Sequence, residues 1–100
     1  MLNEKIKIED KTFGFALIII DLYRYLKSKK NENVISKQLL KSGTSIGANT
    51  HEAQAAQSKK DFASKMAIAS KEARETQYWL KLLDCSGYLE GFEKKGCFIF

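Results

Sequence analysis

Two apolar stripes with the spacing of packed helices constrain this chain more than any other feature of its sequence. Each alternates steps of four and three residues over seven positions. One stripe consists of Ile35, Leu39, Ser42, Ile46, Asn49, Ala53 and Ala56, and the other of Phe62, Met66, Ala69, Ala73, Thr76, Leu80 and Leu83. A sustained repeat of about 3.5 residues is typical of helices packed side by side. The stripes therefore predict two long antiparallel helices.

A third helix is predicted before them, over residues 10–30. The chain has no proline, so nothing of that kind interrupts a long helix. This segment carries two neighbouring apolar stripes, one with Phe15, Ile19, Leu22 and Leu26 and the other with Phe13, Ala16, Ile20 and Tyr23, with Leu17 beside the second. A helix that is apolar over so much of its circumference needs cover on more than one side. We therefore expect one of the two stripes to lie at a subunit contact.

Cap signals set the other boundaries. Ser58 with Asp61 three residues later predicts a capped helix start, and Gly87 predicts a helix stop. The expected helices are thus 10–30, 34–57 and 59–86, within one all-α antiparallel bundle domain covering residues 1–100.

The stretch 43–47 contains G-x-S-x-G, the pattern of a hydrolase nucleophile elbow, with Ser45 as the candidate nucleophile. That elbow requires a strand before it and a sheet beneath it, and the sequence predicts neither. His51, the only histidine, lies about 240° around the predicted helix from Ser45. We therefore expect no hydrolase chemistry and no enzymatic activity.

The same stretch has a packing interpretation. Two glycines one turn apart in a helix each cost about 1 kcal/mol relative to alanine, so Gly43 and Gly47 predict a close approach by a neighbouring helix. Asn49 lies within the apolar stripe, where a buried hydrogen bond of its side chain would set the helix register. Glu52 lies on the same side of the helix and is the expected partner of that bond.

Charge is the second informative property. The chain has 17 Lys and Arg against 12 Asp and Glu, a net charge of +5. Between residues 24 and 41 there is one acid, Glu32, among six bases. Such a patch suits a polyanion such as RNA or DNA, although a solvated lysine-rich surface explains it equally well. The candidate phosphate-binding residues are Arg24, Lys27, Lys30, Lys37 and Lys41, with Lys59 and Lys60 near the second turn.

Other classes of site receive little support. Cys85 and Cys97 are twelve residues apart without nearby histidine, so no metal site or cofactor is expected. The apolar run 13–20 ends at Asp21, well short of the about 20 residues that cross a bilayer. The charged first residues contain no secretion signal, so a cytoplasmic location is expected. No small-molecule substrate is indicated.

Three motifs give the chain a family resemblance: SGTSIGAN-HEA at 42–53, QSKKDF at 57–62 and KEARETQYWL at 71–80. Over residues 11–90 it resembles the four-helix-bundle proteins encoded by intervening sequences of bacterial 23S rRNA genes, which are related to accessory proteins of diversity-generating retroelements. The resemblance implies an up-and-down four-helix bundle, a homopentamer and a basic surface that binds nucleic acid. Relative to that pattern the fourth helix is truncated, leaving a short remnant at 88–100.

Two functions from different classes follow. The first is a non-enzymatic protein that binds RNA or DNA through phosphate contacts. The alternative is a helical oligomerisation or adaptor module whose partner is another protein. Trp79, beside Arg74 and Lys81, is a candidate for base stacking, but its position next to the apolar stripe favours a place at the edge of the core.

Overall fold

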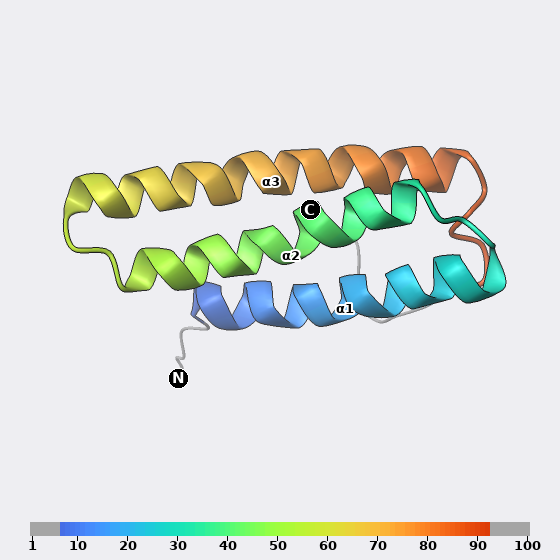
Figure 1. Cartoon of the computed structure of the whole chain (residues 1–100), viewed down its shortest axis with the longest axis horizontal. Helices are drawn as coiled ribbons and strands as arrows, with labels where there is room; N and C mark the ends of the chain where they lie inside the picture. Colours follow the sequence, from blue (N-terminus) through green and yellow to red (C-terminus); the bar gives the residue numbers. More distant parts are fainter. Residues whose placement is uncertain (1–6, 93–100) are drawn as a thin grey trace, which may run out of the picture.

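Three antiparallel helices make up the fold (Figure 1). The computed structural model describes residues 7–92, which form α1 (Ile8–Lys29), α2 (Ile35–Gln54) and α3 (Lys59–Cys85). The prediction of an all-helical chain is confirmed. A four-helix bundle is not found, since the described residues contain three helices and no strand. Most of the expected remnant of a fourth helix, residues 93–100, lies outside the described part of the chain.

The helix order places α2 in the middle. It packs against α1 on one side and against α3 on the other, whereas the backbones of α1 and α3 do not come into contact with each other. The result is a flat molecule with extents of 44 × 32 × 19 Å. Figure 1 shows the three helices running side by side with their long axes nearly parallel.

The core lies toward the end of the molecule where α1 ends and α2 begins. Its buried members come from all three helices: Ile19, Leu22, Leu26, Leu39, Leu80 and Leu83. These residues belong to the predicted stripes, which explains why each helix turns this face inward.

The two stripes of α1 have different environments. Ile19, Leu22 and Leu26 are buried, and Phe15 packs against them. In the other stripe, the side chains of Phe13 and Leu17 are 66% and 51% exposed. Within one chain, α1 therefore buries one stripe and leaves Phe13 and Leu17 in solvent.

Both predicted cap signals of α3 are confirmed. The Ser58 hydroxyl accepts a hydrogen bond from the Asp61 N–H at 3.0 Å, and Ser58 is the N-cap. At the other end Gly87 has φ of +84°. The N–H of Gly87 donates to the Asp84 carbonyl and that of Tyr88 to the Leu83 carbonyl, the two bonds of a Schellman motif.

The residues after α3 return toward α1. Tyr25 donates a hydrogen bond from its hydroxyl to the Glu90 carbonyl at 2.5 Å, and its ring lies 5.4 Å from that of Phe92. Tyr88, Leu89 and Phe92 pack against the core cluster. This segment, 86–92, thus joins the end of α3 to the C-terminal half of α1.

Candidate nucleic-acid interface

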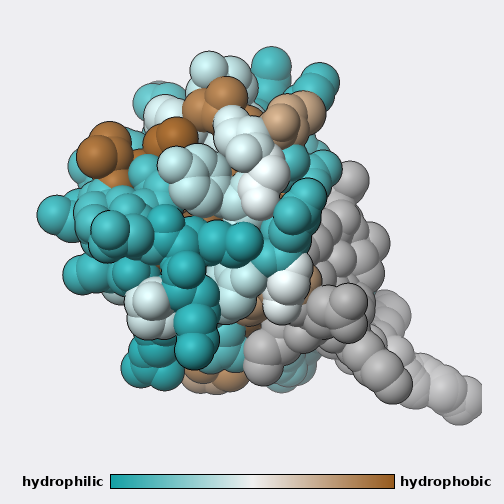
Figure 2. Space-filling view, turned by 90° about the vertical axis from the view of Figure 1, so that its right-hand side faces the viewer, coloured by the Kyte–Doolittle hydropathy of each residue, from teal (hydrophilic) through white to brown (hydrophobic). Residues whose placement is uncertain are grey.

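The connection between α1 and α2 brings most of the predicted basic residues to one end of the molecule. Arg24, Lys27 and Lys29 lie in the last two turns of α1, and Lys37 and Lys41 lie in the first two turns of α2. All five are exposed, whereas Lys30, in the connection, is half-buried. We call Arg24, Lys27, Lys37 and Lys41 the hairpin cluster. Figure 2 views this end of the molecule and shows hydrophilic residues over much of its described surface.

Glu32, the one acid in this stretch, is turned inward. It is only 8% exposed. Its carboxylate accepts hydrogen bonds from the N–H groups of Val34, Ile35 and Ser36 at 3.1, 2.8 and 2.6 Å. These are free donors at the start of α2, where the helix dipole also favours a negative charge. The acid therefore caps α2 and contributes little negative charge to the surface of the hairpin cluster.

The chain reaches this arrangement through a left-handed residue. Asn31 has φ of +57°, a conformation that asparagine tolerates better than most residues. The next N–H, that of Glu32, donates to the Leu26 carbonyl at 2.9 Å and closes the end of α1. Sequence reasoning identified Glu32 only as an isolated acid. A signal for its capping role was present in the sequence, because Glu32 stands three residues before Ile35, where the apolar stripe begins.

The side chains of Lys27 and Lys30 point to different sides of α1. Lys27 Nζ lies 5.4 Å from the centre of the Tyr23 ring, and Lys30 Nζ lies 6.0 Å from that of Tyr25. The two tyrosines are about 200° apart around α1, and Tyr25 faces segment 86–92. Lys30 therefore does not share a face with the other members of the predicted patch.

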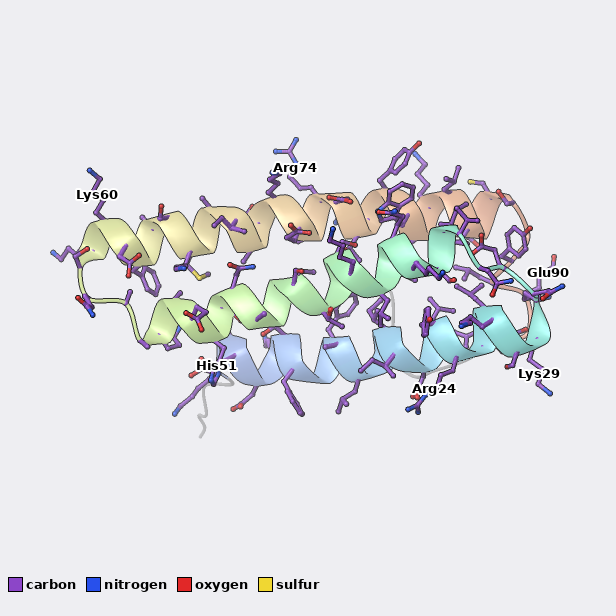
Figure 3. All side chains as sticks on the ribbon, viewed as in Figure 1. Arg24, Lys29, His51, Lys60, Arg74 and Glu90 are labelled. Carbon is purple, nitrogen blue, oxygen red and sulfur yellow. The ribbon has the colours of Figure 1, made fainter. Side chains whose placement is uncertain are left out.

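The remaining predicted bases are far from this end. Lys59 and Lys60 open α3, at the opposite end of the long axis from Lys29 (Figure 3). Arg74 and Lys60 both point away from the bundle in Figure 3. The structure thus separates the predicted basic residues into the hairpin cluster, Lys30 beside Tyr25, and Lys59 and Lys60 at the start of α3.

The predicted packing residues of α2 lie along the α1–α2 interface. A Cβ atom on Gly47 would lie 3.3 Å from the Thr12 carbonyl oxygen, and Gly43 lies against Ile19. Beside them, the hydroxyl oxygens of Thr12 and Thr50 form a buried hydrogen bond of 2.8 Å. The two glycines and this bond hold the helix backbones close together.

Asn49 and Glu52 do not act as expected. The Asn49 side chain donates to the carbonyl of Ser45 in its own helix at 2.9 Å, and Glu52 is exposed. The buried hydrogen bonds between helices instead join Thr12 to Thr50 and Thr76 to Ser42, the latter at 2.9 Å. Asn49 is half-buried, and the acceptor of its side chain belongs to its own helix. For the second of these bonds between helices the sequence held a signal, because Ser42 and Thr76 are polar members of the predicted stripes, whereas Thr12 and Thr50 lie outside them.

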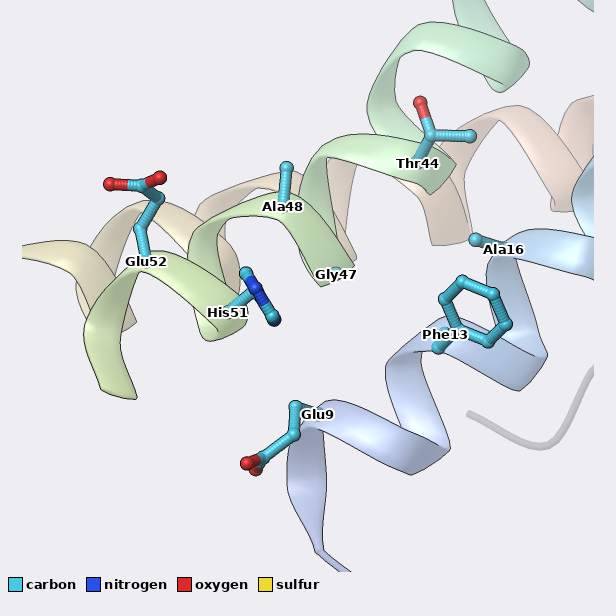
Figure 4. Close-up of a pocket in the computed structure, with 8 residues that line it drawn as sticks. All are labelled: Glu9, Phe13, Ala16, Thr44, Gly47, Ala48, His51 and Glu52. Atoms are coloured by element: carbon cyan, nitrogen blue, oxygen red, sulfur yellow. The ribbon is translucent and has the colours of Figure 1, made fainter. Parts of the chain in front are cut away.

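Ser45 sits in the middle of α2 and donates its hydroxyl to the Lys41 carbonyl at 2.7 Å. It is therefore neither on a strained turn nor beside His51, which lines a groove with α1. This open groove, about 410 Å³ in volume, lies between Phe13 and Ala16 of α1 and Gly47 and His51 of α2 (Figure 4). Glu9 and Glu52 stand at one end of it.

Trp79 lies at the edge of the core, half-buried against the apolar cluster. Its Nε1 donates to Glu75 Oε2 at 3.2 Å. The exposed neighbour is Tyr78, whose side chain is 59% exposed.

Metal and membrane sites find no support in the described residues. Between residues 7 and 92, no three His, Cys, Asp or Glu side chains are grouped so that they would hold a metal ion. Over the same range, no helix combines the length and apolar character needed to cross a bilayer.

Comparison with known proteins gives the family. The sequence matches the family of 23S rRNA-intervening sequence proteins over residues 4–96. The chain therefore belongs to that family. It is also similar to a protein of unknown function from the S23 ribosomal protein family of Bacteroides thetaiotaomicron VPI-5482, known from a crystal structure. The two share 52% identity and a TM-score of 0.81, over 82% of this chain and 76% of the other. A search of curated proteins found no match.

Proposed function

We propose that this chain is a non-enzymatic protein that binds RNA or DNA through phosphate contacts made by the hairpin cluster, and that it works as a homo-oligomer. The observation that carries the proposal is the burial of Glu32. The only acid of residues 24–41 is turned onto the N-terminus of α2, so the exposed charges within this stretch are all positive.

The cations of the hairpin cluster are available to a ligand. Within residues 7–92, the side chains of Arg24, Lys37 and Lys41 form no ion pair with a carboxylate. Contacts of this kind neutralise phosphates without reading the base sequence. The expected binding is therefore weak for one chain, steeply dependent on salt and similar for RNA and DNA of any sequence.

Oligomerisation is proposed on the exposed stripe of α1. Phe13 and Leu17 are large apolar side chains that are mostly exposed in one chain, and the open groove toward Gly47 continues this surface. A contact with a second copy would cover it, and the family resemblance favours five copies. Several hairpin clusters in one assembly would bind one nucleic acid together, which raises the overall affinity without new contacts.

The same exposed stripe supports the alternative function, an adaptor module that binds another protein. Nucleic-acid binding distinguishes the two. An adaptor would not bind RNA or DNA at low salt, whereas the proposed function requires binding that weakens steeply as salt is raised.

The test removes charge from one end of the molecule at a time. Lys27, Lys37 and Lys41 are replaced together with glutamine, and the matched control replaces Lys7, Lys11 and Lys65, three lysines outside the hairpin cluster and outside the predicted phosphate contacts. Affinity for RNA and DNA is measured against salt concentration. The hairpin variant should bind more weakly and with a flatter salt dependence, while the control should bind nearly as the parent does. Equal losses in both variants, or no loss in the hairpin variant, would rule out the hairpin cluster as the site.

A further inference from the structure

The solvent-facing side of α3 combines an exposed aromatic ring with positive charge. Tyr78 is the exposed aromatic residue of this helix's C-terminal half, and Lys71, Arg74 and Lys81 are exposed as well. On a helix of about 100° per residue, these three cations lie within about 60° of Tyr78 around the axis. Figure 3 shows Arg74 pointing away from the bundle on this side of α3.

The acids of this helix lie elsewhere. Asp61, Glu72 and Asp84 are each about 100° or more away from Tyr78 around the axis. Glu75 is closer, but its carboxylate accepts the hydrogen bond from Trp79 Nε1. The surface around Tyr78 is therefore positively charged, with the aromatic ring of Tyr78 at its centre.

The Tyr78 ring is also held in place. Its centre lies 5.1 Å from that of the Trp79 ring, in an edge-to-face arrangement with an interplanar angle of 68°. Trp79 is itself fixed, because it packs on the core and its Nε1 is hydrogen-bonded. One face of the Tyr78 ring is thus presented to solvent by a rigid support, which lowers the entropy lost when a ligand stacks on it.

We propose that this face of α3 binds single-stranded nucleic acid, with a base stacked on Tyr78 and the adjoining phosphates contacted by Lys71, Arg74 and Lys81. A ring flanked by cations is the arrangement by which proteins bind single strands without sequence preference, because every base has a π face. In a duplex the bases are paired and stacked within the helix, so Tyr78 has no base to receive. The inference rests on the proposed function, to which it adds a second surface and a preference for single strands.

Variants of Tyr78 test the stacking contact. Oligo(U), oligo(dT) and a duplex of the same length are titrated at low salt with the parent, Tyr78→Ala and Tyr78→Phe. The Tyr78→Ala variant should lose about 5- to 150-fold in affinity for the single strands, which corresponds to roughly 1–3 kcal/mol for one stacked base. Tyr78→Phe keeps the ring and should bind as the parent does. Affinity for the duplex should not change in either variant.

Ile68→Ala is the matched control, since Ile68 is also an exposed apolar residue of α3, 43% exposed, but has no aromatic ring. It should leave single-strand binding unchanged. Helicity and unfolding are measured for all variants, so that a folding defect is recognised. Trp79 is the only tryptophan of the chain, and its fluorescence should change when oligo(U) binds and remain constant with the duplex.

The possible failures are separable. If the parent binds RNA and DNA but Tyr78→Ala binds single strands equally well, the α3 surface is ruled out and the proposed function stands. If Tyr78→Ala weakens duplex and single-strand binding alike, stacking on an unpaired base is ruled out. If the parent binds no nucleic acid at low salt, both proposals are wrong.

Discussion

Gly43 of α2 lies so close to Ile19 of α1 that a Cβ atom on the glycine would be 2.9 Å from both Cγ atoms of the isoleucine. Carbon atoms do not approach this closely without a shift in structure. Ile19 is completely buried and branched at Cβ, so its side chain has little freedom to move away. This contact sets how closely the two helices pack.

Replacement of Gly43 with alanine should therefore destabilise the protein by about 1–3 kcal/mol, the usual effect of overpacking a core. Gly14 is the control, because a Cβ atom there would meet nothing within 4 Å. Gly14→Ala should stabilise the protein by up to about 1 kcal/mol through helix propensity. Urea unfolding followed by circular dichroism measures both effects. If the two variants have the same stability, the close contact with Ile19 does not limit the packing.

The hydrogen bond between Ser42 and Thr76 provides a second prediction. Both hydroxyls are buried, 2.9 Å apart, and the Thr76 hydroxyl also lies 2.8 Å from the Glu72 carbonyl. Thr76→Val should cost about 1–3 kcal/mol, because it leaves a buried hydroxyl with poor partners. The double variant Ser42→Ala with Thr76→Val should be less destabilised than the sum of the single variants. Strict additivity in this cycle would contradict a direct bond between the two residues.

Glu32 is expected to stabilise the first turn of α2. Glu32→Ala removes the acceptor of three backbone N–H groups, and caps of this kind contribute about 0.5–2 kcal/mol. The unfolding free energy should fall by about that amount, and hydrogen exchange of the Ile35 and Ser36 amides should accelerate. Glu52→Ala, at an exposed position of the same helix, should change neither measurement. Unchanged exchange at Ile35 and Ser36 in the Glu32 variant would show that water replaces the cap without cost.

Self-association should depend on the exposed stripe of α1. In the parent, light scattering should give the mass of a homo-oligomer. Replacing Phe13 and Leu17 together with serine removes the apolar contact and should yield monomers with unchanged helicity. Val34→Ser is the control, since Val34 is 72% exposed but lies at the start of α2, away from this stripe. A monomeric parent, or a serine variant with the parent's mass, would show that this surface is not a subunit contact.

The sequence predicted the helices well because three independent signals agreed. The stripes gave the inward faces of α2 and α3, the Ser58 and Gly87 signals gave the ends of α3, and the absence of proline allowed long helices. The end of α2 was placed three residues too late, at 57 instead of Gln54. The N–H groups of Ala55 and Ala56 bond to carbonyls three residues back and tighten the last turn, an effect that alanine-rich sequence does not reveal.

The polar details of the site were less predictable. An apolar stripe predicts which face of a helix is turned inward, but not where along the axis a neighbouring helix has a hydrogen-bonding group. The buried bond expected for Asn49 is therefore made by threonine and serine instead. Charge spacing likewise grouped Lys30 with Lys27, although Tyr23 and Tyr25 draw the two ammonium groups to different sides of α1. By contrast, the position of Trp79 beside the apolar stripe did predict its place at the edge of the core.

The arrangement with α2 in the middle has a consequence for how the chain folds. Every close approach between helix backbones joins neighbours along the sequence, since the backbones of α1 and α3 do not meet. Contacts between sequence neighbours close short loops, which favours fast folding. α1 contacts the α2–α3 hairpin through the shared core, the Thr12–Thr50 hydrogen bond and the contact of Tyr25 with segment 86–92. We therefore expect α1 to open as a separate cooperative unit, with amides that exchange from a partly folded state while α2 and α3 remain protected.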